Sequence, residues 1–81
     1  MRFFPSPDET LQAEALFVST LQASDPISPE IIEDTVAELL RRDGPAECAA
    51  GMAYEFGEHP ETAVRRMRWA RRLVRRTVGS S

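Results

Sequence analysis

Four prolines divide this chain, because each one stands directly before a run of helix-forming residues. They are Pro7, Pro29, Pro45 and Pro60, and none of the runs that follow contains a further proline. Proline is favoured at the first position of a helix, where its missing N–H group would lack a partner anyway and its φ is already helical. The pattern predicts an all-α protein with four consecutive helices.

The apolar residues of these runs recur at the three- and four-residue spacing of amphipathic helices. The predicted helices cover residues 7–23, 29–42, 45–56 and 60–78. Connections of a few residues favour a compact four-helix arrangement with antiparallel or steeply crossed neighbours. A chain of 81 residues suits one helical domain, residues 1–81, with a thin core.

Capping residues mark several of the predicted boundaries. Ser6 and Glu9 have the spacing of a capping box at the start of the first helix, and Ser28 is a suitable N-cap for the second. Gly44 can adopt the left-handed conformation that ends the second helix. Gly57 is the predicted end of the third.

Two of the runs predict close or extensive packing. Leu16 and Phe17 widen the apolar stripe of the first helix beyond one face, so we expect this helix at the centre of the protein or against a second chain. Gly51 lies in the middle of the third helix, where glycine costs about 1 kcal/mol relative to alanine. We therefore expect another backbone close to Gly51. Cys48, in the same helix, is interpreted as a small buried apolar residue.

The charged residues are segregated along the chain. Residues 1–61 contain all thirteen acidic residues and three arginines, a net charge of −10, whereas residues 62–81 contain seven arginines and no acidic residue, a net charge of +7. On a helical wheel, arginines of the last helix gather opposite its apolar stripe, with a tryptophan beside them. We predict a partner-binding surface formed by Arg65, Arg68, Trp69, Arg72, Arg75 and Arg76.

This cluster has one internal explanation and several external ones. The acidic faces of the second and third helices would neutralise the arginines through exposed ion pairs, each worth about 0–1 kcal/mol. An acidic protein surface, including that of a second copy of the chain, is the favoured external partner, because Trp and Arg are common energetic anchors at interfaces. A membrane surface is disfavoured, because the apolar stripe of the last helix is rich in alanine and is needed by the core.

Nucleic acid is the second hypothesis, because residues 49–68 resemble the helix-turn-helix motif of DNA-binding proteins. The resemblance is carried by Met52-Ala53, Phe56-Gly57 and Thr62-Ala63-Val64 followed by Arg65-Arg66. It implies that the third helix supports a recognition helix that begins at Pro60. The turn is one residue longer than in the motif, and Glu58 stands where the motif usually has an aliphatic residue. Phosphate contacts dominate DNA affinity, so the acidity of residues 1–61 places this hypothesis behind protein binding.

Catalytic and metal-binding residues are scarce. His59 is the single histidine and Cys48 the single cysteine, too few for a zinc site or a nucleophile–base pair. The glycines are isolated rather than gathered into a phosphate-binding loop, and the Asp-Ser-Leu sequence of acyl carrier proteins is absent. We expect a non-enzymatic regulatory or adaptor protein without cofactor or metal. A cytoplasmic location is expected, since no apolar run has the length of a signal peptide or a membrane span.

Overall fold

The computed structural model describes residues 7–79 of the chain. Its four α-helices have the following bounds: α1 Pro7–Val18, α2 Pro29–Arg42, α3 Gly44–Glu58 and α4 Pro60–Gly79. No strand occurs within residues 7–79. Each helix begins at one of the four prolines or one residue before it, which confirms the predicted all-α, four-helix fold. The predicted capping box at Ser6 lies outside the described residues.

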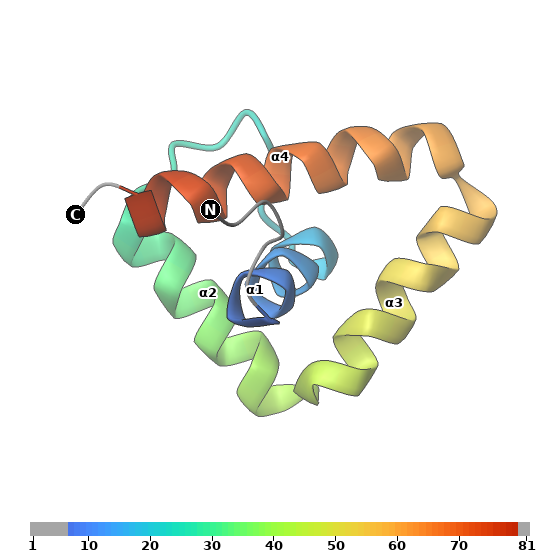
Figure 1. Cartoon of the computed structure of the whole chain (residues 1–81), viewed down its shortest axis with the longest axis horizontal. Helices are drawn as coiled ribbons and strands as arrows, with labels where there is room; N and C mark the ends of the chain where they lie inside the picture. The colour runs from blue at the N-terminus through green and yellow to red at the C-terminus, as the bar shows by residue number, and fades with distance from the viewer. Residues whose placement is uncertain (1–6, 80–81) are drawn as a thin grey trace, which may run out of the picture.

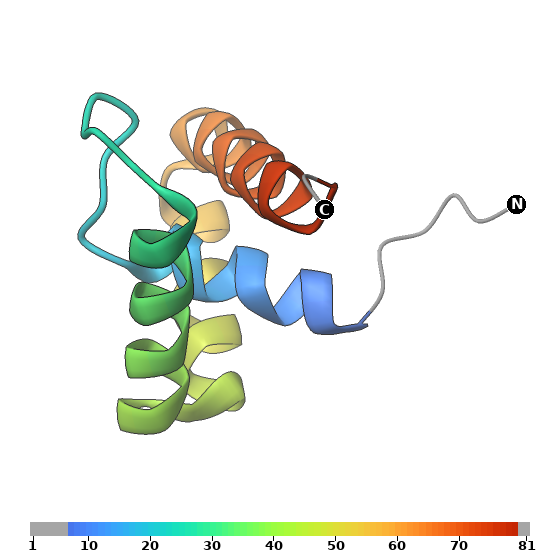
Figure 2. The same ribbon diagram turned by 90° about the vertical axis from the view of Figure 1, so that its left-hand side faces the viewer.

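Helix α1 lies at the centre of the molecule. Figure 1 looks along α1 and shows α2, α3 and α4 around it as three sides of a triangle. In Figure 2, α4 lies above α1, while α2 and α3 extend below it. α1 contacts each of the other three helices, and its residues Leu16 and Phe17 are 0% and 3% exposed. The central position predicted from the wide apolar stripe is therefore confirmed.

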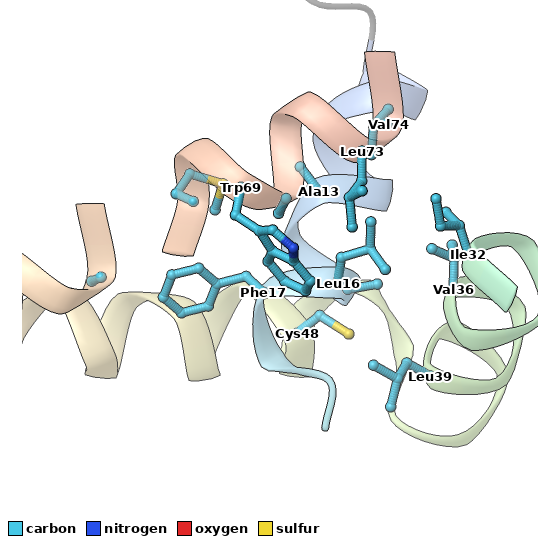
Figure 3. Packing of buried hydrophobic residues seen from close by; sticks show 14 residues of the cluster. Ala13, Leu16, Phe17, Ile32, Val36, Leu39, Cys48, Trp69, Leu73 and Val74 are labelled. Carbon is cyan, nitrogen blue, oxygen red and sulfur yellow. The ribbon is translucent and has the colours of Figure 1, made fainter. Parts of the chain in front are cut away.

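The core is formed by the apolar faces of all four helices (Figure 3). The ring of Phe17 stacks on that of Phe56 from α3, with centroids 5.7 Å apart. Cys48 is buried, and this burial raises the pKa of its thiol, in agreement with its interpretation as an apolar core residue. Small side chains let α1 and α4 approach closely. The alanines buried on these two helices are Ala13, Ala15, Ala63 and Ala70.

The boundaries of α2 agree with the prediction. Ser28 has extended backbone angles, and its Oγ accepts a hydrogen bond from the N–H group of Ile31 at 3.3 Å. At the other end of the helix, the N–H group of Asp43 donates to the carbonyl of Leu39 at 2.8 Å. Gly44 follows with a φ of +86°, the left-handed conformation that glycine adopts without steric penalty.

Two predicted helix ends are wrong. The first helix was expected to continue to about Ala23, but α1 ends at Val18 because Ser19 binds the backbone itself. The Ser19 N–H and Oγ–H groups both donate to the carbonyl of Leu16, at 3.2 and 2.7 Å, in competition with further helical hydrogen bonds. Gly57 does not end the third helix, which continues to Glu58, since Gly57 does not take a positive φ.

The close packing predicted at Gly51 is present, but the neighbour is a side chain and not the expected backbone. A Cβ atom added there would lie 3.1 Å from Cγ1 of Val18, so the missing side chain allows α3 to pack against the last turn of α1. The glycine that weakens α3 locally is therefore explained by its packing.

We expect alanine substitution to have opposite effects at the two glycines that do not pack closely. Gly57 lies in α3 with open space around its Cα, so Gly57→Ala should raise the free energy of unfolding by about 0.5–1 kcal/mol through helix propensity. Gly44→Ala should lower it by about 1–2 kcal/mol, because alanine pays a steric penalty at a positive φ. Urea unfolding measures both. A stabilising Gly44→Ala would contradict the account of the α2–α3 turn.

Candidate functional site

The face of α4 that points away from the core is covered by arginine. Six of the seven arginines of α4 are exposed and make no hydrogen bond or ion pair within the described residues. We call them the arginine surface: Arg65, Arg68, Arg71, Arg72, Arg75 and Arg76.

Within residues 7–79, no ion pair joins the arginine surface to a carboxylate, although Glu9 of α1 lines a small pocket beside Arg71 and Arg75. Among described residues, the ion pairs are Glu38–Arg41 on α2 and Arg42–Asp43 at its C-terminal end, the latter at 3.2 Å. Both are local to α2 and exposed. The internal explanation of the cluster requires ion pairs between α4 and the acidic faces of α2 and α3. The described residues form no such ion pair.

Trp69 is separate from the arginine surface. Its side chain is 8% exposed, and Figure 3 shows the ring directed from α4 towards Phe17 and Leu16. Both α1 and α3 pack against α4, so a wider arc of the helix is covered than its aliphatic stripe suggests. The expectation that Trp69 stands beside the arginines as a surface residue is wrong, and Trp69 is a core residue.

The seventh arginine of α4, Arg66, is half-buried and binds the end of α1. Its Nε–H group donates to the carbonyl of Phe17 at 2.6 Å, and its Nη2 group lies 3.2 Å from the carbonyl of Leu16. Nη2 also donates to the carbonyls of Ser19 and Leu21, each at 2.8 Å. The guanidinium carbon lies 4.6 Å from the centre of the Trp69 ring, in a cation–π contact.

Arg66 therefore supplies a donor to the carbonyl of Phe17 in the last turn of α1 and adds to the hydrogen bonds that Ser19 already makes with the carbonyl of Leu16. These carbonyls carry the partial negative charge of a helix C-terminus, which a cation stabilises. Burial lowers the pKa of the Arg66 guanidinium, yet an arginine remains protonated at neutral pH. Sequence reasoning missed this role. The available signal was that Arg66 lies in the apolar stripe of α4, three residues after Ala63 and four before Ala70.

The junction of α3 and α4 departs from the helix-turn-helix pattern. A single residue, His59, separates the two helices. Its N–H group donates to the carbonyl of Glu55 at 2.7 Å, and its carbonyl accepts from Ala63 at 2.8 Å. Ala53, expected at the helix crossing, is exposed, and Gly57, expected in the turn, is helical. The local features that the motif requires are therefore absent from this junction.

A groove of about 430 Å³ opens where the C-terminal end of α1 meets α3 and α4. Phe17 and Val18 line it from α1, Gly51 and Tyr54 from α3, and Thr62 and Arg66 from α4. Tyr54 is 64% exposed. The groove lies at the N-terminal end of α4 and combines apolar walls with polar groups, as binding pockets commonly do.

Within residues 7–79, no three His, Cys, Asp or Glu residues are grouped so as to hold a metal ion. None of the four helices there has the length and hydropathy needed to cross a membrane.

Comparisons with protein-family models, with curated proteins and with solved structures found no match to this chain. The arginine surface and the groove are therefore the features of this chain that bear on its function.

Proposed function

We propose that this chain is a small, non-enzymatic regulatory or adaptor protein of the cytoplasm, which acts by binding an acidic protein surface through α4. The arginine surface forms the contact, with Arg65, Arg68, Arg72, Arg75 and Arg76 as its main residues. Trp69 takes no direct part, because it is buried.

The observation that carries this proposal is that no ion pair within the described residues involves the arginine surface. Arginines four residues apart on a helix, such as Arg68 and Arg72, repel each other by about 0.2–0.5 kcal/mol per pair. An acidic partner would remove this repulsion, and opposite charges would accelerate association. Since α4 already contributes one face to the core, the binding face is held rigidly.

DNA binding through the same arginines is the competing hypothesis. It is placed second because the α3–α4 junction lacks the helix-turn-helix features and because the exposed acids of α2, Glu30, Glu33, Asp34 and Glu38, would repel a polyanion as long as duplex DNA. An acidic patch on a protein is smaller and avoids this repulsion.

The proposal is tested by affinity capture with charge-reversed variants, followed by measurement of binding with the purified partner. We expect Arg68→Glu with Arg72→Glu to weaken binding at least tenfold. The matched control is Arg41→Glu with Arg42→Glu, which reverses two exposed arginines on α2 and should change binding less than threefold. Circular dichroism checks that both variants keep the helical fold.

Two results would contradict the proposal. One is an equal loss of binding in both double variants, which would indicate an effect of net charge alone. The other is loss of the captured material after nuclease treatment, together with binding of a random-sequence DNA duplex to the purified chain at ~50 mM salt. The second result would favour the DNA hypothesis.

A further inference from the structure

Charge on the arginine surface accounts for attraction to a partner but not for tight binding. Exposed ion pairs contribute about 0–1 kcal/mol each, and interfaces obtain most of their affinity from a few buried anchors. Trp69 would be the natural anchor of α4, yet it lies in the core at 8% exposure. We therefore look for an anchor that comes from the partner and enters a cavity within reach of Arg65, the arginine of this surface one helical turn from Thr62.

The groove between α1, α3 and α4 has the size and position for this purpose. Its volume of about 430 Å³ exceeds that of any single side chain, and its walls include Phe17, Val18 and Gly51. The exposed ring of Tyr54 stands among the lining residues and can contact an inserted aromatic side chain. Thr62 and Arg66 connect the groove to α4, the helix that carries the arginine surface.

We propose that this groove binds one large apolar side chain of an acidic peptide segment, whose carboxylates bind Arg65 and Arg68. This inference rests on the proposed function and identifies the chemistry of the partner. The occupant is a segment of another protein that combines a single aromatic or large aliphatic residue with neighbouring acidic residues.

The charges around the groove also determine the register of the segment. Glu55 lines the groove and repels a carboxylate there, so the inserted residue is uncharged. Arg65 and Arg68 follow Thr62 by three and six residues, about 4.5 and 9 Å along α4 at 1.5 Å per residue, and at 3.6 residues per turn they lie about 60° and 120° around the helix from Thr62, towards solvent. The segment must therefore cross α4 obliquely as it leaves the groove, with Arg65 as the nearer arginine. An extended segment advances about 3.3 Å per residue. Its carboxylates should therefore lie about one to three residues from the anchor.

A series of labelled peptides tests this arrangement with a defined probe. The parent peptide is acetyl-Gly-Trp-Gly-Glu-Glu-Gly-Lys-amide with an uncharged fluorophore on the lysine side chain, and fluorescence anisotropy gives its dissociation constant. Replacement of its tryptophan by alanine should weaken binding to the wild-type chain at least tenfold. Replacement of both glutamates by glutamine should also weaken binding at least tenfold.

Two variants of the chain test the position of the anchor. Thr62→Trp places a large side chain at the groove from an exposed position and should weaken binding of the parent peptide at least tenfold. Val64→Trp is the matched control, because Val64 is 39% exposed on the same helix and does not line the groove. It should change the dissociation constant less than threefold.

The outcomes separate this inference from the proposed function. Equal binding of the tryptophan and alanine peptides would overturn the groove proposal and leave charge recognition by α4 intact. Equal binding of the glutamate and glutamine peptides would overturn both. A wild-type chain that sediments as a dimer, with Thr62→Trp monomeric, would assign the groove to a second copy of this chain and contradict a foreign acidic segment.

Discussion

Replacing Arg66 by alanine is expected to lower the free energy of unfolding by about 3 kcal/mol, the largest effect of any arginine substitution in α4. The guanidinium donates to carbonyls at the end of α1 and just beyond it, at 2.6–3.2 Å. Hydrogen bonds from a charged donor contribute about 1.5–3 kcal/mol, and their loss leaves half-buried carbonyls without a donor. The cation–π contact with Trp69 is lost as well.

Urea denaturation followed by circular dichroism measures this change. Arg65→Ala is the control, because Arg65 is the preceding residue of the same helix and is exposed; it should alter stability by no more than about 0.5 kcal/mol. Arg66→Lys should recover only part of the loss, since an ammonium group cannot reproduce the planar fork of donors. A decrease below about 1 kcal/mol for Arg66→Ala would show that α1 does not depend on this arginine.

The second large effect is expected in the last turn of α1, where Leu16 enters the core. Leu16 is completely buried, and Leu→Ala substitutions at such sites cost about 2–5 kcal/mol through lost burial and a residual cavity. We expect Leu16→Ala to destabilise the fold by about 3–4 kcal/mol. That is a large fraction of the total for a domain of this size, so the urea midpoint of unfolding should fall by a comparable fraction.

Leu40→Ala provides a matched control for Leu16→Ala. Leu40 is the third residue from the end of α2, as Leu16 is of α1, but it is only half-buried. The two substitutions therefore have similar effects on helix propensity and differ in burial. We expect Leu40→Ala to cost about 1 kcal/mol, and equal losses at the two positions would contradict the central placement of α1.

The features predicted correctly from the sequence are those that depend on nearby residues. The Ser28 cap, the left-handed Gly44 and the four helix starts follow from the chemistry of a few adjacent groups. The close packing at Gly51 could also be inferred from the sequence. Glycine in mid-helix lowers helix stability, and a close packing contact is a common reason for its presence there.

The features that were missed depend on residues far apart in the chain. The end of α1 is bound by Arg66, which lies 49 residues after Phe17, and no local pattern reports that contact. The burial of Trp69 follows from the combined cover of α1 and α3 over α4, which a helical wheel of α4 alone does not contain. The candidate site was therefore predicted only in part. The exposed arginines could be predicted from the helical periodicity of α4 alone. The groove could not, because residues of three helices form it.

Helix α4 has two kinds of arginine: Arg66 supports the fold, and the six arginines of the arginine surface are exposed to solvent. Modification with phenylglyoxal, which reacts with accessible guanidinium groups, tests this directly when the sites are quantified by mass spectrometry over time. The predicted result is fast modification of Arg65, Arg68, Arg71, Arg72, Arg75 and Arg76 in the native protein, with Arg66 protected until urea is added. Equal rates at Arg65 and Arg66, or protection of the arginine surface in the isolated monomer, would contradict it.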